Sequence, residues 1–198
     1  MKLTKAIVLT YDRHRSLTDH MIFCYEKLWP KHPYIFQVPY QEIPPTLQSS
    51  RVQYHKCPAD IKGTVLTLLD ALDDEEMIYW CIDDKYPIWL DIKKIKKIHQ
   101  WLSPTDGKDI GGLLFCRCRG MLSRQNLTDK EVIDDQGDIC LERKNYEQIW
   151  IHQYLKVKVI RHLFNSFPNR IPAAESMDVF KGLVEKPNSH HLYVTGNN

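Results

Sequence analysis

Two short polar segments of the chain carry residue types that suit phosphate and sugar chemistry. The first is TYDRHR, residues 10–15, and the second is IDDKYP, residues 82–87. Arginine side chains pair with phosphate oxygens in a fork geometry. Two adjacent carboxylates after a strand are commonly compensated by a hard divalent cation that a substrate diphosphate also binds. The two segments together predict a nucleotide site that uses Mg²⁺ or Mn²⁺.

The two adjacent carboxylates have different expected roles. Neighbouring residues of an extended chain point in opposite directions, so we expect Asp84 to contact the metal. Asp83 would then hold ribose, water or a neighbouring side chain. The alternative is that the pair forms a turn or a helix cap before Pro87. For residues 10–15 the alternative is a polar loop with a local Asp–Arg pair.

Both polar segments follow apolar runs that have the length of a strand. Residues 5–13, KAIVLTYDR, begin with a continuous apolar run that is typical of a strand buried on both faces. Residues 77–82, MIYWCI, are uncharged and rich in aromatic and branched side chains. In open α/β sheets, ligands bind at the carboxyl ends of the strands. The polar residues after these two runs are therefore the first candidates for a site.

The remaining patterns predict alternating helices and strands. Apolar residues at helical spacing predict helices over residues 17–28, 64–72 and 92–102. Apolar runs predict further strands over residues 34–40 and 109–119. This alternation predicts an α/β fold, a three-layer sandwich with a mainly parallel central sheet.

Other segments have weaker patterns. SLTD, residues 16–19, has the spacing of a capping box at a helix start. Residues 120–147 are polar and indicate a surface hairpin or loop. Residues 149–164 match both helix and strand templates, and their length favours a helix. The tail from Pro168 shows no periodicity, so we expect His190 and His191 to be solvated.

Composition excludes several classes of protein. The chain has 198 residues, 43% of them hydrophobic, and a formal net charge of +2, which favours one globular domain and disfavours a nucleic-acid binder. It has no apolar run of membrane-spanning length and no signal-peptide cleavage pattern, so we expect a cytoplasmic protein. The six cysteines include no CxxC pair, and we expect them to be reduced and mostly buried.

The order of these motifs resembles a known family. The strand LTYDR, the helix IKGTVLTLLDAL, the segment EEMIYWCIDDKYPI, a further helix and the strand IGGLLF resemble nucleotide-sugar-dependent glycosyltransferases of the GT-A fold. The similarity is greatest to a bacterial group from polysaccharide and lipopolysaccharide gene clusters. It covers residues 6–115 well and the rest loosely. The resemblance implies a Rossmann-like domain over 1–198, with a nucleotide-binding part (1–117) and an acceptor-side part (118–198).

The resemblance also implies roles for individual residues. It assigns nucleotide-sugar binding to the end of the first strand, a basic position and the first aspartate: Thr10, Tyr11, Asp12, Arg13, Lys62 and Asp83. It assigns the divalent cation, Mn²⁺ or Mg²⁺, to Asp84. The motif here is DDKY instead of D-x-D, and Lys85 could itself neutralise a diphosphate.

Inverting glycosyl transfer needs a carboxylate base that deprotonates the acceptor hydroxyl. Glu175, in the segment PAAESMD, is the candidate catalytic base, and Asp178 is the substitute. Alternatively, Glu175 lies in the first turn of a helix that begins near Pro172, where negative charge is favourable.

The sequence therefore predicts a glycosyltransferase that moves a sugar from a nucleoside-diphosphate sugar to a glycan or lipid-linked acceptor in cell-surface polysaccharide synthesis. One alternative is a non-catalytic glycosyltransferase-like binding module. Another is a nucleotidyltransferase, which predicts a glycine-rich loop that TYDRHR lacks. The basic helix that contains residues 93–97 could contact anionic lipid from the inner face of a membrane, although a solvated helix face is the alternative. The apolar and aromatic content leaves room for a homodimer.

Overall fold

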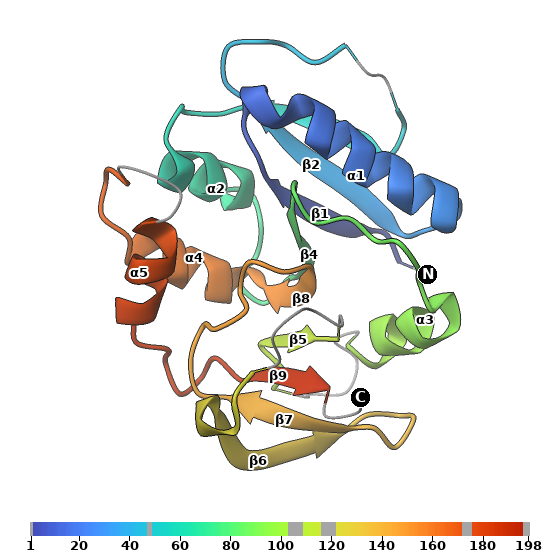
Figure 1. Cartoon of the computed structure of the whole chain (residues 1–198), viewed down its shortest axis with the longest axis vertical. Coiled ribbons are helices and arrows are strands. Elements are labelled where there is room, and N and C mark those ends of the chain that lie inside the picture. The colour runs from blue at the N-terminus through green and yellow to red at the C-terminus, as the bar shows by residue number, and fades with distance from the viewer. Residues whose placement is uncertain (1, 47–48, 103–108, 116–121, 172–175, 196–198) are drawn as a thin grey trace.

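The computed structural model describes residues 2–46, 49–102, 109–115, 122–171 and 176–195. Within these ranges the chain forms a nine-stranded sheet in the order β3-β2-β1-β4-β8-β5-β9-β7-β6 (Figure 1). The strands are β1 (Thr4–Leu9), β2 (Tyr34–Tyr40), β3 (Val52–Lys56), β4 (Met77–Ile82), β5 (Gly112–Leu114), β6 (Leu127–Ile133), β7 (Ile139–Arg143), β8 (Gln153–Lys156) and β9 (Leu192–Thr195). The helices are α1 (Arg15–Leu28), α2 (Ile61–Leu69), α3 (Ile92–Trp101), α4 (Val157–Asn165) and α5 (Ser176–Leu183).

The sheet is parallel in the half that the N-terminal residues form. Strands β3, β2, β1 and β4 pair in parallel. Strand β8 is antiparallel to both of its neighbours, β4 and β5, and β9 then pairs in parallel with β5. The hairpin of β6 and β7 completes the sheet, and β7 is antiparallel to β9.

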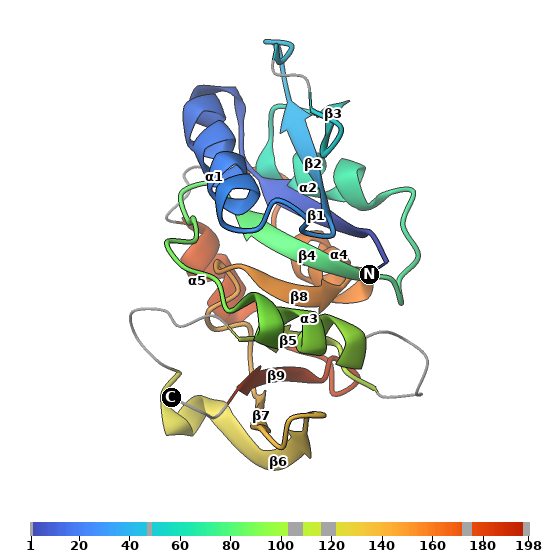
Figure 2. The ribbon, with the colours of Figure 1, turned by 90° about the vertical axis from the view of Figure 1, so that its right-hand side faces the viewer.

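Helices cover both faces of the sheet (Figure 2). Alternate residues of β1 point to opposite faces: Ala6 and Val8 belong to one core cluster, and Ile7 belongs to the other. The first cluster also contains buried residues of α1 and α3, and the second contains those of α2 and α4 with partly buried residues of α5. The molecule is therefore the three-layer α/β sandwich that the sequence predicts, of Rossmann-like class.

Most predicted elements are confirmed, and the differences have local causes. The strand predicted over residues 77–82 is β4, and residues 127–143 form a hairpin. The stretch 149–164 is not one helix, because residues 153–156 pair with β4 and β5 as strand β8 before α4 begins at Val157. The sequence did not predict β3 or β9. Cys116 and Cys118 lie outside the described residues.

The capping box predicted for Ser16–Asp19 is wrong. Helix α1 begins at Arg15, and its N-cap is His14, which makes no side-chain cap hydrogen bond. The described cysteines are free thiols, and Cys57, Cys81 and Cys140 are buried, as expected. No helix in the described part of the chain combines the length and the apolar character that crossing a bilayer requires.

Candidate functional site

The first connections of the sheet create a switch point between β1 and β4. From β1 the chain proceeds to β2 and β3 on one side, and then returns to form β4 on the other side of β1. Leu9 and Ile82 are register partners, so residues 10 and 83 leave the two parallel strands side by side. Ligands of open α/β sheets bind in the crevice outside such a point. Both polar segments singled out from the sequence therefore lie at this location.

A hydrogen-bonded set of three side chains joins the two strand ends. His14 Nδ1 lies 2.9 Å from Asp83 Oδ2, and His14 Nε2 lies 2.9 Å from the hydroxyl of Tyr11. The carboxylate can only accept, so Nδ1–H of His14 donates to Asp83, and the hydroxyl of Tyr11 is hydrogen-bonded at Nε2. The side chain of Asp83 is 7% exposed, whereas that of His14 is 37% exposed. A buried carboxylate thus orients an imidazole that solvent can reach.

Asp84 has surroundings unlike those of Asp83. Its carboxylate is exposed, and Oδ2 lies 2.9 Å from the ammonium of Lys85. The adjacent aspartates therefore differ as the sequence predicts, one turned inward and one outward. Asp84 is the carboxylate that an incoming cation or ligand can reach.

The carboxylate of Asp12 is hydrogen-bonded to the backbone of a neighbouring loop. Its carboxylate accepts from the N–H groups of Gln41, Glu42 and Ile43, at 2.8–3.0 Å. Burial is the largest single effect and raises the pKa of Asp12. The three backbone hydrogen bonds, that of Ile43 first, and the charge of Arg15 together lower the pKa by more, so the net pKa is below its usual value. Asp12 fixes the loop after β2 against the end of β1.

The other two predicted residues of this segment also have distinct surroundings. Thr10 is buried, and its hydroxyl lies 2.7 Å from that of Thr18 in α1. Arg13 is exposed in the short 3-10 helix over Asp12–His14. Of the predicted binding residues at the end of β1, Tyr11 and Arg13 are therefore the ones whose side chains are exposed to a ligand.

A buried histidine that the sequence analysis did not single out supports the end of β4. His152 Nε2 lies 2.9 Å from the carbonyl oxygen of Ile82, and Nδ1 lies 2.7 Å from the hydroxyl of Tyr25. Burial lowers the pKa of His152 to about 4, against the opposing effects of the Ile82 carbonyl and the charge of Asp84. The ring is therefore neutral near pH 7 and holds the residue directly before Asp83.

Lys62 lies apart from this set and is already hydrogen-bonded. Its ammonium donates to the carbonyl oxygens of Asn165 and Phe167, at 3.1 and 2.7 Å, and to Asn169 Oδ1 at 3.3 Å. Lys62 thus connects the first turn of α2 to the chain that leaves α4.

Asp178, the substitute candidate for the base, belongs to α5, which packs on the face of the sheet opposite to α1. Glu175 lies outside the described residues. Asp178, in α5, accepts from the ammonium of Lys181 at 2.8 Å and from Trp150 Nε1 at 2.7 Å. The bond from Lys181 lowers the pKa of Asp178, burial opposes it, and the bond from Trp150 adds to the lowering. A carboxylate with a lowered pKa is a weaker base for an acceptor hydroxyl.

The predicted solvation of the tail histidines is wrong. His190 is buried, and its Nδ1 lies 3.1 Å from the hydroxyl of Tyr146. His191 Nδ1 lies 2.7 Å from Glu142 Oε1. Both histidines directly precede β9, an element that no sequence pattern indicated.

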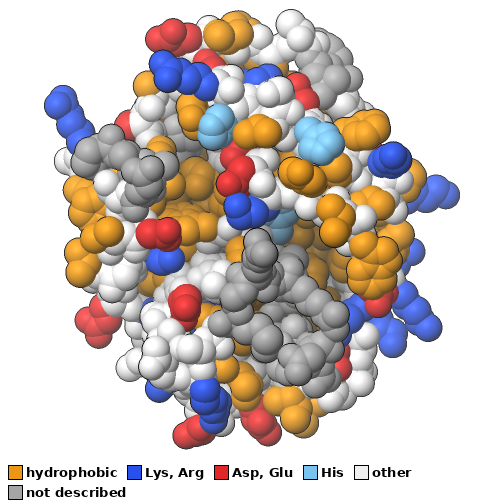
Figure 3. Space-filling model, viewed as in Figure 1, with side chains coloured by type: hydrophobic (Ala, Val, Ile, Leu, Met, Phe, Trp, Pro, Cys, Tyr) orange, Lys and Arg blue, Asp and Glu red, His pale blue; other side chains and the backbone are white. Residues whose placement is uncertain are grey.

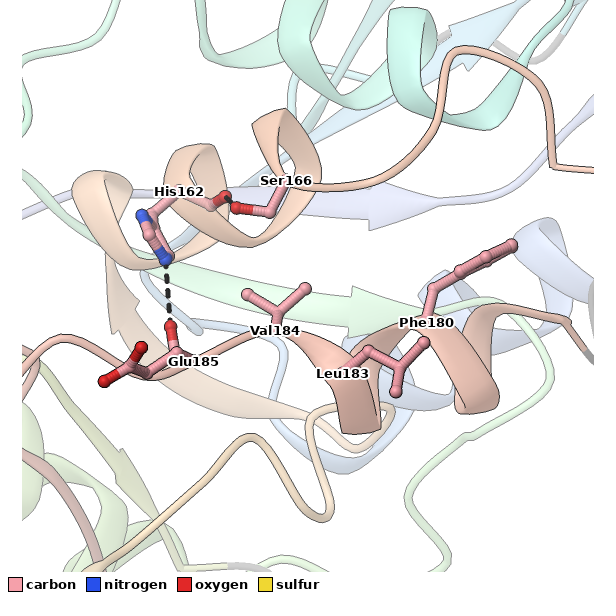
Figure 4. Close-up of a pocket in the computed structure, with 6 residues that line it drawn as sticks. All are labelled: His162, Ser166, Phe180, Leu183, Val184 and Glu185. Carbon is pink, nitrogen blue, oxygen red and sulfur yellow. Dashed lines mark hydrogen bonds between the residues drawn. The ribbon is translucent and has the colours of Figure 1, made fainter.

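The surface near the switch point and a separate pocket can be seen in two views. In Figure 3, histidine and charged side chains lie among hydrophobic ones in the upper half of the view, where α1 and the end of β4 lie. An open pocket of about 380 Å³ lies elsewhere, between α4 and α5 (Figure 4). Its lining includes Phe180, Leu183 and His162, whose Nε2 lies 3.1 Å from the carbonyl oxygen of Glu185. That pocket contains none of the residues at the switch point.

Comparison with known proteins gives only remote similarities. No protein-family model and no curated protein sequence matches the chain. One similar solved structure is 4-diphosphocytidyl-2C-methyl-D-erythritol synthase from Anaerococcus prevotii, with 10% identity and a TM-score of 0.44 over 98% of this chain and 86% of that one. Another is the bifunctional IspDF from Campylobacter jejuni, with 8% identity and a TM-score of 0.40 over 100% of this chain and 50% of that one. This chain thus spans half the length of the second protein, and neither name denotes a glycosyltransferase. Similarities this remote transfer no activity and no residue role.

Proposed function

We propose that this chain is a transferase that moves a sugar from a nucleoside-diphosphate sugar to an acceptor, with the nucleotide at the carboxyl ends of β1 and β4. The observation that carries the proposal is the bond between His14 and Asp83, which joins the two strand ends at the switch point. The resemblance of the motif order to glycosyltransferases of the GT-A fold supports the choice of donor.

The exposed side chains around the His14–Asp83 bond can contact different parts of the nucleotide. Tyr11 presents an exposed ring on which a nucleobase can stack, and its hydroxyl is held by His14. Arg13 is exposed and can pair with phosphate oxygens. Thr10 and Asp12 position this segment through buried or backbone hydrogen bonds instead of touching the donor.

The described residues suit a cation that the substrate helps to hold. No group of three or more His, Cys, Asp and Glu side chains capable of holding a metal occurs among them. Magnesium in phosphate-transfer sites is typically bound by one or two carboxylates together with substrate phosphates, and the exposed Asp84 can supply one. When bound, such an ion stabilises the negative charge of the departing diphosphate. Lys85, 2.9 Å from Asp84, adds a second positive charge at that place.

Transfer to a hydroxyl also needs a base. Glu175 remains the base proposed from the sequence, and Asp178 is the weaker candidate because Lys181 and Trp150 engage its carboxylate. His14 is a third candidate, because Asp83 orients its ring through Nδ1, and its Nε2, which contacts the Tyr11 hydroxyl, can take a proton once that hydroxyl moves aside. Activity of His14→Gln and Glu175→Gln, with donor binding measured in parallel, will distinguish them.

The donor site is tested by thermal unfolding with UDP, GDP, ADP and CMP, with their sugar conjugates and with the nucleoside triphosphates, each with and without Mn²⁺. A ligand at a hundredfold excess over Kd adds about 2.7 kcal/mol, which raises Tm by roughly 5–10 °C for a domain of this size. Asp84→Asn is expected to remove the Mn²⁺-dependent part of the shift. Asp129→Asn is the matched control, because Asp129 is also an exposed aspartate paired with one cation, Arg124.

Three results would contradict the proposal. If no nucleotide raises Tm, the assignment of a donor site to the ends of β1 and β4 is contradicted. An equal loss in both aspartate variants would remove the role of Asp84. A shift with nucleoside triphosphates but not with sugar conjugates would replace the donor class and favour nucleotidyl transfer.

A further inference from the structure

The segment between β4 and α3 exposes large apolar side chains. Ile88 is 87% exposed and Trp89 is 71% exposed, and Tyr86 is also exposed. In Figure 1 this segment, in green, leaves the end of β4, passes beside α1 and ends at α3. A contiguous exposed apolar patch on a polar surface marks a site of interaction.

The apolar surface continues onto α1. The ring of Tyr86 makes an edge contact with His20, with centroids 4.8 Å apart. Leu17 and Phe23 lie three residues to either side of His20 on α1, and both are exposed. The ammonium of Lys27 lies 5.9 Å from the ring centre of Phe23.

Lysines adjoin this apolar surface. Lys93, Lys96 and Lys97 lie on the face of α3 opposite to its buried residues, and all three are exposed. They form no ion pair with any residue in the described ranges, whereas Lys94 pairs with Asp138 at 2.7 Å. Residues 85–97 contain five lysines and a single acidic residue, Asp91, which caps α3. Figure 3 shows basic side chains below hydrophobic ones at the right-hand edge, where this segment meets α3.

We infer that this surface, formed by Tyr86, Ile88, Trp89, Lys93, Lys96 and Lys97, binds an anionic lipid bilayer. Trp and Tyr side chains favour the interface between water and hydrocarbon, and Ile88 can enter the acyl region. Lysine stems extend along apolar material while their charges reach lipid phosphates. The partner must be apolar and negatively charged at once, and a bilayer that contains anionic lipid has both properties.

Membrane binding would also orient the proposed donor site. Asp84 lies beside this surface because Tyr86 follows it by two residues, and Tyr86 contacts His20 of α1, the helix that His14 precedes. On the premise of the proposed function, an acceptor carried in the bilayer would reach the donor without leaving the membrane. Bilayer binding itself does not depend on that premise.

The test is sedimentation of the full chain with phosphatidylcholine vesicles and with vesicles that contain phosphatidylglycerol. The wild type is expected to sediment only with the anionic vesicles. Each lysine near an anionic surface contributes about fivefold, so K93Q/K96Q/K97Q is expected to weaken binding roughly 100-fold. The matched control is K56Q/K130Q/K144Q, which removes three exposed lysines of β3, β6 and the segment after β7 and is expected to bind nearly as the wild type.

The apolar contribution has its own pair of variants. I88S/W89S is expected to release the protein from anionic vesicles, whereas V179S/L183S, which alters two exposed apolar side chains of α5, is expected to leave binding unchanged. The inference is overturned if the wild type stays in the supernatant, if both lysine triples weaken binding equally, or if I88S/W89S binds as the wild type. It is also overturned if the wild type is a dimer that I88S/W89S dissociates, since that assigns the surface to a second copy. Nucleotide-induced Tm shifts in I88S/W89S keep this test separate from the donor site.

Discussion

Arg143 in β7 donates a hydrogen bond to the amide oxygen of Gln153 in β8 across 2.8 Å, and both side chains are fully buried. These strands are not neighbours in the sheet, because β5 and β9 lie between them. A buried guanidinium that loses an acceptor bears a large desolvation cost. We expect Gln153→Leu to lower the free energy of unfolding by about 3–4 kcal/mol. In urea unfolding, Arg143→Met/Gln153→Leu should then be less destabilised than the sum of the two single variants, and additivity within about 0.5 kcal/mol would contradict the coupling.

Two glycines should respond in opposite directions to the same substitution. A Cβ at Gly112 would lie 2.5 Å from Leu155 Cδ2 and 2.8 Å from the carbonyl oxygen of Tyr154. We expect Gly112→Ala to destabilise the protein by about 1–3 kcal/mol, because β5 is packed tightly against β8. Gly182, in α5, meets nothing within 4 Å, so Gly182→Ala should stabilise by up to about 1 kcal/mol. Urea midpoints measure both, and a loss of stability in Gly182→Ala would refute the comparison.

Substitution of Lys62 should distinguish a structural role from a ligand-binding role. Lys62→Met keeps most of the apolar stem but removes the donor to the carbonyl oxygens of Asn165 and Phe167. We expect a loss of about 1–3 kcal/mol in the free energy of unfolding and an unchanged Kd for the nucleotide. Unfolding in urea and nucleotide titration report the two separately. Unchanged stability with weakened nucleotide binding would instead restore the ligand role that the family resemblance assigns to this lysine.

Three buried histidines should make stability depend on pH. Burial lowers the pKa of His32, His152 and His190 to about 4 each, whereas an unfolded histidine titrates near 6.5. Between pH 6.5 and 4 the unfolded chain takes up protons that the folded chain does not, so stability is full above about pH 6.5 and falls as the pH falls. Each histidine contributes roughly 1 kcal/mol per pH unit in this window. Urea unfolding at pH 7, 6 and 5 measures the slope, and His190→Asn should reduce it.

The sequence pattern predicts an element well where one face or both faces are apolar without interruption. Met77–Ile82 is such a run, and its strand has the predicted bounds. Residues 149–164 are apolar with Lys156, Lys158 and Arg161 interspersed, and this pattern matches both helix and strand templates. No local signal therefore marks the change from β8 to α4 at Val157, which pairing with β4 and β5 decides. Strand β9 has only four residues, and its place between β5 and β7 comes entirely from long-range pairing.

In the candidate site too, the local sequence pattern reveals some residues, and long-range contacts determine others. Asp83 and Asp84 are visible in the sequence because they follow a buried strand directly. The importance of His14 is not visible, because its partner Asp83 is 69 residues away and the local pattern RHR gives no sign of the pairing. His152 is even less evident, since it supports Ile82 from a strand whose type the sequence left open.

The place of β9 in the sheet sets an order on folding. The hairpin of β6 and β7 joins the rest of the sheet by pairing with β9, which the ribosome makes much later than the hairpin. The parallel strands β1, β2 and β3 pair with one another without any later segment. We therefore expect this parallel unit to collapse early, and the hairpin to wait until Leu192–Thr195 has emerged. During that interval the backbone groups along the β7 edge of the hairpin are unpaired and open to other chains, so the late strand protects against aggregation as well as completing the fold.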